Sequence, residues 1–422
     1  MSARAATGAA AAATATPQIR VLACCGGMVT FGGAERMTFT ALAAARRAGA
    51  RVHCIVNGWM YERIAEAAGQ IGATWVTSAY RVRLDRRTRD PRALWRQLVD
   101  VARTNRDLLR EARRLRATHV LVPSHDIVIR NFPALLLLRL VRVAVVMRLC
   151  NAPGADASQR RLWRRWVNPA VDRFVCNSTF TRAALVACGV PSSKTTLIYN
   201  ALPVSRQEQV PAEPIPGRLI YVGQVIPPKG LHVLLDAMGQ LVAGGADLTL
   251  DVVGEVEGWM SPAYGDYRER ILARAARPDL AGRVRFLGWR EDVQALMSRA
   301  SLHCCPSLPE IRESFGIVVL EAKSAGVASV VLPSGALSEV VTHGVDGWVC
   351  DAATADALAD TCRSALADPM RLRAMGEAAR RSLERFSREA FDRRWQAVFE
   401  PAGSAAATAE LEAPAPANGR QG

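Results

Sequence analysis

Two glutamates in the second half of the chain stand where carboxylates could recognise hydroxyl groups. Glu313 precedes the apolar run that begins at Phe315, and Glu321 lies inside that run. We expect Glu313 in the loop before a helix and Glu321 about two turns inside it. Ionised carboxylates there can accept hydrogen bonds from the vicinal hydroxyls of a sugar and a ribose. The alternative is that both only solvate or cap the helix, but a glutamate within an apolar run needs a partner.

A lysine before a predicted helix is the second feature that could do chemistry. Lys229 precedes an apolar helix expected over 231–238. An ammonium group just before a helix N-terminus can pair with a diphosphate, because the helix dipole also favours an anion there. The only other lysines of the chain are Lys194 and Lys323, whereas lysine and arginine together number 54. Because this chain nearly always uses arginine as its cation, the lysine at position 229 is less well explained as an ordinary exposed cation.

Glycines near the N-terminus mark a third possible site. Gly32 and Gly33 follow the first expected strand and open a helix that runs through Leu42. Such a turn lets a ligand approach the backbone, although it is common in α/β proteins. The spacing is not G-x-G-x-x-G, so a dinucleotide is disfavoured. His125 and Asp126 follow a strand at the same edge; because adjacent residues rarely point to one site, we expect a structural or acceptor-lining role for His125 rather than a catalytic dyad.

The elements that must position these residues alternate between short strands and longer helices. Alternation of this kind predicts a parallel sheet with helices on both faces. The first series of expected strands covers 19–24, 52–56, 120–122, 143–147 and 174–176. After a proline-rich stretch that is typical of a linker, a second series covers 219–222, 248–253, 284–286, 302–304 and 329–332.

A length of 422 residues suits two domains, each with its own core. Half of the residues are hydrophobic and 22% are charged, which excludes a disordered chain. We predict six consecutive segments: a disordered tail over 1–16, a first α/β domain over 17–202, a linker over 203–217, a second α/β domain over 218–385, a final helix over 386–401 and a disordered tail over 402–422.

The formal net charge of +15 points to an acidic partner: a nucleotide diphosphate, an anionic membrane or a nucleic acid. Nucleic acid is disfavoured because the basic residues are spread over helices without an aromatic platform. Two segments, 92–116 and 160–166, combine arginines with apolar or tryptophan side chains. Each is either a solvated helix face or a surface attracted to anionic lipid.

Cysteine and hydropathy patterns indicate the compartment. The ten cysteines include two adjacent pairs in strand-like runs, and none has the spacing of a metal site. No uncharged run reaches the roughly 18 residues that span a bilayer, and residues 2–16 lack the apolar stretch of a signal peptide. We therefore expect a cytoplasmic protein without a metal, soluble or peripheral at the inner face of the membrane.

Taken together, these motifs resemble those of the family-4 retaining glycosyltransferases, which have the GT-B fold. The resemblance covers most of the chain from Ile19 to about Phe399. The matching motifs are Gly32-Gly33-Ala34-Glu35, Asn177-Ser178-Thr179, Ile198-Tyr199-Asn200, Val222-Gly223 with Lys229-Gly230, Phe286-Leu287-Gly288-Trp289, and the pair Glu313 and Glu321. The resemblance implies two Rossmann-like domains facing across a cleft, with the last helix crossing back onto the first domain.

The resemblance also implies the reaction and its residues. A nucleotide diphosphate sugar, UDP- or GDP-linked, would donate a sugar to a glycan or lipid-linked acceptor with retention, without a metal or other cofactor. Lys229 would hold the diphosphate and Glu313 the transferred sugar, as the catalytic residues, and Glu321 would hold the ribose. The remaining donor-binding residues would be Gly223, Gln224, Ser314, Phe315 and Gly316. Gly32, Gly33 and His125 would form the phosphate and acceptor side.

Departures from the family pattern keep alternatives open. Gln224 stands where the family usually has arginine, so one of two expected cations is missing, and Arg218, Arg290 or Arg312 could substitute for it. The strand end at 147–151 also lacks the histidine that is common there. A non-catalytic subunit that binds nucleotide sugars is one alternative, which Gln224 favours. A nucleotide-sugar 2-epimerase of the same fold is another, but it suits the two glutamates less well.

Overall fold

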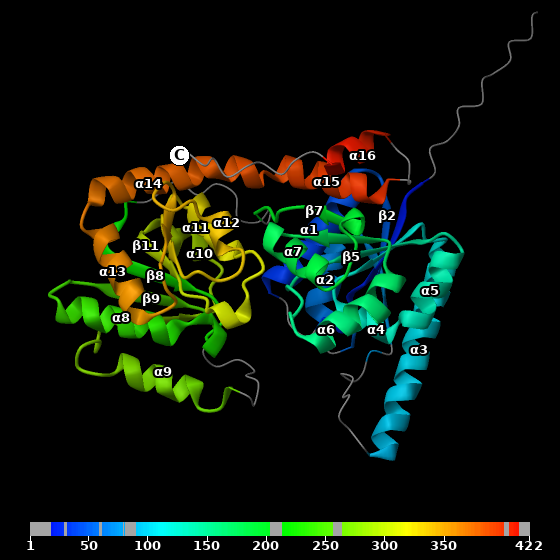
Figure 1. Ribbon diagram of the computed structural model, residues 1–422, viewed down its shortest axis with the longest axis horizontal. Helices are drawn as coiled ribbons and strands as arrows, with labels where there is room; N and C mark the ends of the chain where they lie inside the picture. Colours follow the sequence, from blue (N-terminus) through cyan, green and yellow to red (C-terminus); the bar gives the residue numbers. More distant parts are fainter. Residues whose placement is uncertain are drawn as a thin grey trace, which may run out of the picture.

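The computed structural model describes residues 18–28, 32–58, 61–78, 80, 90–202, 213–255, 264–400 and 405–412. The predicted tail over 1–16 and most of the predicted linker lie outside these ranges. Within them the chain forms two α/β domains, which lie side by side in Figure 1. Each domain has one parallel sheet with apolar clusters on both faces, which confirms the predicted fold class.

The sheet of the first domain has seven strands in the described residues, in the order β3-β2-β1-β4-β5-β6-β7. The strands are β1 Arg20–Cys24, β2 Arg51–Val56, β3 Thr74–Thr77, β4 His119–Val122, β5 Ala144–Arg148, β6 Arg173–Cys176 and β7 Thr195–Leu197. The helices are α1 Gly33–Arg47, α2 Tyr61–Gln70, α3 Pro91–Leu115, α4 His125–Arg130, α5 Phe132–Leu140, α6 Ala157–Leu162 and α7 Thr179–Ala187. Because all strands run parallel, their carboxyl ends lie at one edge, where α1, α4 and α7 begin.

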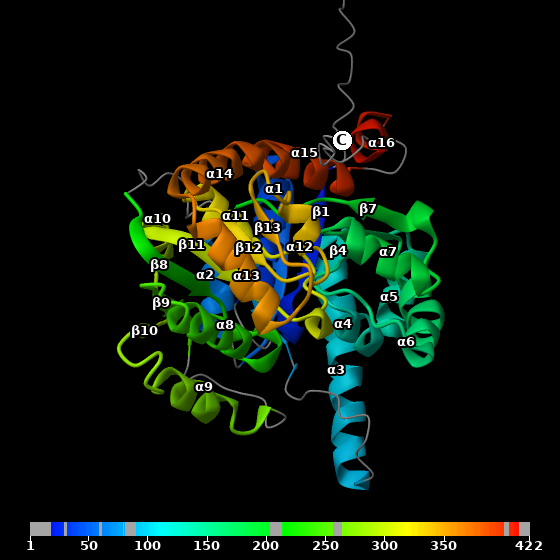
Figure 2. The ribbon, with the colours of Figure 1, turned by 60° about the vertical axis from the view of Figure 1, so that its left-hand side comes forward.

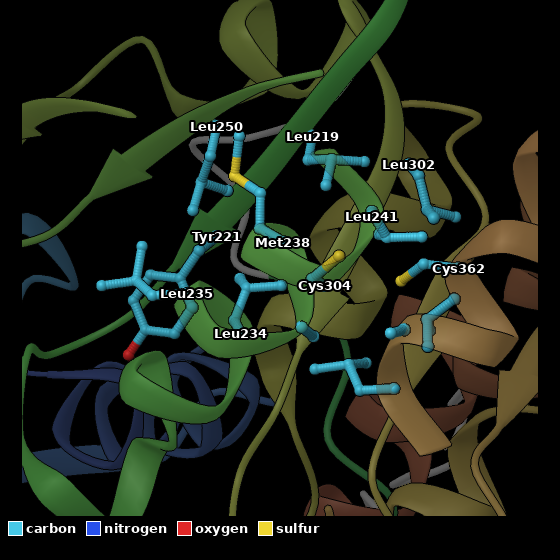
Figure 3. Packing of buried hydrophobic residues seen from close by; sticks show 14 of the residues in the cluster. Leu219, Tyr221, Leu234, Leu235, Met238, Leu241, Leu250, Leu302, Cys304 and Cys362 are labelled. Atoms are coloured by element: carbon cyan, nitrogen blue, oxygen red, sulfur yellow. The ribbon is translucent and has the colours of Figure 1, made fainter. Parts of the chain in front are cut away.

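The sheet of the second domain has six described strands in the order β10-β9-β8-β11-β12-β13. They are β8 Ile215–Val222, β9 Thr249–Val253, β10 Val284–Gly288, β11 Ala300–Cys305, β12 Ser329–Val331 and β13 Gly347–Val349. The helices are α8 Leu231–Ala243, α9 Tyr267–Ala275, α10 Val293–Ser298, α11 Ile317–Ser324, α12 Leu337–Val340, α13 Ala355–Leu366 and α14 Pro369–Arg381. Figure 3 shows the core of this domain, where Leu219 and Leu250 of the sheet pack near Met238 of α8.

The predicted linker extends too far at its carboxyl end. Residues 215–217 belong to β8 in spite of their proline and glycine. The backbone N–H of Ile215 donates to the carbonyl of Arg299 at 2.9 Å, and the Ser301 hydroxyl donates to the carbonyl of Ile215 at 2.6 Å. These bonds hold the start of the strand beside β11, so the second domain begins earlier than expected.

The helix α3 projects from the body of the first domain, as Figures 1 and 2 both show. Leu94 and Leu98 near its amino end are 43% and 63% exposed, whereas Leu108 and Ala112 farther along the same apolar stripe are buried. Asn105, which interrupts the stripe, accepts from the Ala134 N–H at 3.0 Å and donates to the Arg130 carbonyl at 2.8 Å. This asparagine therefore fastens α3 to the junction of α4 and α5.

The last part of the chain returns to the first domain. The helix α15 Arg388–Phe399 follows α14 along one side of both domains (Figure 1) and packs against α1. Its Trp395 and Phe399 are 1% exposed and share a core cluster with Met37 of α1. This contact confirms the expected crossing.

The predicted disorder over 402–422 is wrong for residues 405–412, which form α16. Alanine is a strong helix former, and the helix lies against α15, where Leu411 packs on the first-domain core. The other residues of that predicted tail, apart from this helix, lie outside the described ranges.

Candidate functional site

The two residues predicted to be catalytic form an ion pair. The Nζ atom of Lys229 lies 2.5 Å from Oε2 of Glu313, and their side chains are 25% and 14% exposed. The hydroxyl of Ser307 donates to the same oxygen at 3.1 Å. Burial alone would lower the pKa of Lys229, but the charge and hydrogen bond of Glu313 outweigh it and raise that pKa above its ordinary value. The lysine is therefore a fixed cation at neutral pH.

A tight turn brings Lys229 to this position. Residues Pro227–Lys229 form a 3-10 turn that ends at Gly230, whose φ of +72° is the left-handed conformation that glycine tolerates. A Cβ atom at Gly230 would lie 1.9 Å from the carbonyl oxygen of Pro306, so any larger residue would separate the two loops. The Lys229 loop can therefore lie directly against the Pro306 and Ser307 loop.

The loop that carries Glu313 is braced by the segment after β12. The Ala336 N–H donates to the carbonyl of Glu313 at 2.8 Å, and the Glu313 N–H donates to the Ser334 hydroxyl at 3.4 Å. A Cβ at Gly335 would lie 2.2 Å from the Glu313 carbonyl oxygen, so this glycine allows the close approach. We call residues 312–316 the donor loop.

Glu321 lies nearer to the helix start than expected. The helix α11 begins at Ile317, after Gly316 in the left-handed conformation with φ of +83°. Glu321 is thus just over one turn inside the helix rather than two, because the glycine delays the helix start. It is 7% exposed, while Glu313 stays in the loop as predicted.

The amino ends of α1 and α11 meet between the domains. A Cβ built on Gly33 would lie 3.2 Å from Cδ1 of Ile317, so the first residues of the two helices are in contact. Each helix start carries unpaired N–H groups and partial positive charge. At α1, Glu35 already accepts one of these, from Gly32 at 2.9 Å. The remaining groups favour an anion at this point.

The sequence prediction missed Arg148, the last residue of β5. The residue is 2% exposed, and its guanidinium donates to the Ala34 carbonyl at 3.0 Å and to the Asn200 side chain at 3.1 Å. It also donates to the Thr38 hydroxyl and the Cys150 sulfur. All four partners are uncharged, so a positive charge lies buried beneath the first turn of α1. An arginine at the end of a buried strand is the sequence signal that could have identified it.

Two residues predicted to bind the donor have other contacts. The Ser314 hydroxyl donates to the carbonyl of Cys150 in the first domain at 2.6 Å. Phe315 is 1% exposed and lies 6.0 Å from Tyr199 and 5.6 Å from Phe386, measured between ring centroids. The Ser314 side chain thus joins the domains, and the Phe315 side chain fills a core.

Two of the three candidate arginines form ion pairs with aspartates, and the third contacts the first domain. Arg290 forms an ion pair with Asp292 at 2.7 Å, and Arg218 lies 3.7 Å from Asp251. Arg312 donates to the carbonyl of Pro153 in the first domain at 2.6 Å.

Gln224 itself is exposed, and its carbonyl accepts from the Tyr221 hydroxyl at 2.7 Å. Gly223, the preceding residue, ends the turn after β8, and its backbone lies against Gly254, where a Cβ would lie 1.9 Å from the Gly223 carbonyl oxygen. The position of Gln224 is thus open to solvent, and it carries no charge.

His125 is the first residue of α4. Its ring lies 5.6 Å from the ring of Trp163, and Nε2 lies 3.7 Å from Asp126. Trp163 is 2% exposed, so the histidine rests on the core of the first domain. An acceptor-lining role for His125 stays a prediction.

In the described residues there is no group of three or more histidine, cysteine, aspartate or glutamate side chains that could hold a metal ion. None of the helices in this part of the chain is both long and apolar enough to cross a membrane.

The chain is similar to known proteins in both sequence and fold. Residues 31–206 match the family described as Glycosyltransferase Family 4, and residues 206–382 match Glycosyl transferases group 1. The chain is 28% identical over 235 residues to the glycogen synthase of Mycobacterium tuberculosis (strain ATCC 25618 / H37Rv), which covers 54% of each protein. It is 26% identical over 296 residues to the lipopolysaccharide core biosynthesis mannosyltransferase LpcC of Rhizobium leguminosarum bv. viciae, covering 69% of this chain and 78% of that one.

A solved structure of Anabaena Alr3699/HepE in complex with UDP and glucose has a TM-score of 0.70 at 20% identity, covering 89% of this chain and 98% of that one. The chain spans about half the length of the glycogen synthase. The two family matches meet at residue 206 and together cover both domains, and the chain therefore belongs to the group 1 and family 4 glycosyltransferases, which have the GT-B fold.

Proposed function

We propose that this protein transfers a sugar, with retention, from a nucleotide diphosphate sugar to an acceptor. The observation that carries the proposal is the meeting of the α1 and α11 amino ends at Gly33 and Ile317, with the Lys229 ammonium in the same domain as α11. Two helix starts and a cation suit a diphosphate, whose charge grows as it leaves. A protein with the same fold is known in complex with UDP and glucose, which supports a nucleotide as the ligand.

Three of the predicted residues have a part in the proposed reaction. When the donor binds, Glu313 exchanges its bond with Lys229 for hydroxyls of the transferred sugar, and Glu321 accepts from the ribose. Lys229 then stabilises the departing diphosphate, and the partly buried setting strengthens that interaction relative to water. The leaving phosphate takes the proton of the attacking hydroxyl on the same face, so no separate base is needed.

A panel of UDP-, GDP- and ADP-sugars tests the proposal, with nucleotide release as the readout and EDTA in a parallel series. We expect release with one donor class and no loss under chelation. Loss that manganese restores would contradict the metal-independent mechanism. Tight nucleotide binding without turnover on any donor and acceptor would favour the non-catalytic subunit. Interconversion of the free nucleotide sugar would favour the epimerase.

We further propose that the acceptor is a glycan or a lipid-linked glycan that the first domain meets at an anionic membrane of the cytoplasmic face. The support is the outer half of α3, where Leu94, Trp95 and Leu98 are 43%, 68% and 63% exposed beside Arg92 and Arg96. Unpartnered apolar side chains with adjacent arginines are typical of helices that rest on anionic lipid.

A second basic surface lies near α6. Arg160, Arg161, Arg164 and Arg165 line a surface pocket of about 570 Å³. Of the two tryptophans in this segment, Trp163 packs into the core, while Trp166 is 49% exposed. The four guanidinium groups suit phosphate, which they can bind in a bidentate manner.

A further inference from the structure

A carboxylate of the second domain caps a helix of the first. Oε2 of Glu339 accepts from the Thr179 N–H at 2.8 Å, and Oε1 accepts from the Phe180 N–H at 2.6 Å. These are the first two residues of α7, whose initial N–H groups have no partners within the helix. The hydroxyl of Ser178, the N-cap residue, accepts from the Thr181 N–H, one turn farther along. The start of α7 therefore depends on a charged group from the other domain.

Glu339 is firmly attached to the donor loop. It lies on α12, directly after the segment around Gly335 that braces the backbone of Glu313. Leu337 of α12 also lies against Gly316, where an added Cβ would come within 2.5 Å of its side chain. A displacement of Glu339 must therefore move Glu313 with it.

Other bonds cross between the domains at the same place. Ser314 and Arg312 of the donor loop donate to carbonyls of the first domain, as described above, and the Asn177 amide donates to the Ser314 hydroxyl at 3.4 Å. The Tyr199 hydroxyl donates to Glu339 at 3.5 Å. Glu339 differs from Ser314 and Asn177 because it brings a full negative charge to the positive end of a helix, which makes its bonds the stronger ones.

We propose that Glu339 is a positioning residue that closes the two domains and sets the place of Glu313 relative to the Gly32 and Gly33 loop. This rests on the proposed function, because it concerns the same site. In Figure 1, α12 and α7 face each other between the domains. Without the carboxylate, the Thr179 and Phe180 amides open to water and the donor loop loses its fixed distance from the first domain. Misplacement of reacting groups lowers the rate of the chemical step more than it weakens binding of the donor.

The test compares Glu339→Ala and Glu339→Gln with Glu310→Gln, a control at an exposed glutamate of the same domain. Hydrogen exchange of peptides that contain residues 179 and 180 is measured with and without UDP. Turnover is measured on the donor that the nucleotide-sugar panel selects. For Glu339→Ala we expect hydrogen exchange at residues 179 and 180 to become about tenfold faster and kcat to fall about tenfold. The donor KM should stay within about threefold of the wild-type value. Glu339→Gln should fall between this variant and wild type, and the control should match wild type.

Wild-type exchange at residues 179 and 180 in Glu339→Ala would overturn the proposal. A rise in the donor KM as large as the fall in kcat would overturn it too. If Glu339→Ala does not fold, Glu339→Gln decides by the same two readouts. The exchange measurement needs no transfer activity. A protein that transfers no sugar but shows the predicted exchange therefore disproves the proposed function and keeps the closing role of Glu339.

Discussion

The Nζ atom of Lys229 and the Oε2 atom of Glu313 are 2.5 Å apart, so the predicted cation and the predicted sugar ligand hold each other before any substrate arrives. A diphosphate must take over the lysine, and the sugar must take over the glutamate. The pair thus keeps both side chains oriented while neither charge is left without a partner.

Removal of either donor contact should weaken nucleotide binding. We expect Lys229→Ala and Glu321→Ala each to cost about 1.5 to 3 kcal/mol, the contribution of a hydrogen bond to a charged group, or roughly 10- to 150-fold in Kd. Calorimetric titration with UDP and GDP checks this, with Glu310→Ala as the exposed control. Wild-type affinity in both variants at an unchanged melting temperature would end the assignment of the site.

Much of the fold follows from apolar runs, and what the sequence missed has a common cause. Every predicted strand is present, whereas β3, β7 and β13 were not predicted. All three lie at sheet edges, and β3 shows that a half-covered edge strand needs no continuous apolar run, since three of its four residues are exposed. The pairing of Lys229 with Glu313 was equally out of reach, because it depends on how closely two loops approach.

Position 224 offers a gain-of-charge test. Gln224→Arg should be tolerated or should tighten nucleotide binding by up to about 1.5 to 3 kcal/mol, because it returns a cation beside the diphosphate. Gln224 is exposed, and Arg218 and Arg290 already pair with aspartates, so the new side chain has space and these two arginines are engaged elsewhere. The Kd for UDP or GDP is the measurement. Collapse of binding would show that another arginine already fills this place.

Membrane contact is tested by flotation with vesicles rich in phosphatidylglycerol. We expect binding at low salt that high salt weakens, since each arginine near an anionic surface contributes about 1 kcal/mol. Changing Arg161, Arg164 and Arg165 to Gln should release the protein, and Trp95→Ser should weaken binding through lost apolar contact. If the vesicles are ignored, or if the arginine variant binds equally well, a soluble acceptor becomes the better proposal.

Acid should destabilise the fold through His119. Burial lowers the pKa of this histidine to about 4. The ordinary pKa of histidine, which applies in the unfolded chain, is 6.5. Between pH 6.5 and about 4 the unfolded state therefore binds a proton that the folded state does not bind. Stability therefore falls as the pH falls through this window, by about 3 kcal/mol at pH 4.

Urea unfolding at a series of pH values measures this effect. His119→Gln should reduce the dependence, and His303, whose pKa burial lowers to about 3, should retain the rest of it. His343→Gln, at an exposed position, should leave the dependence unchanged. An unchanged slope in His119→Gln would rule out this histidine as the source.

The crossing of α15 onto α1 also has a consequence for synthesis. Trp395 and Phe399 complete the core around Met37, although more than 350 residues separate them in the chain. A ribosome that adds about 5 to 20 residues per second must finish the second domain before it supplies them. The domain that is synthesised first is therefore the last to acquire its complete core. Until then the apolar face of α1 that packs on Trp395 and Phe399 lacks these partners.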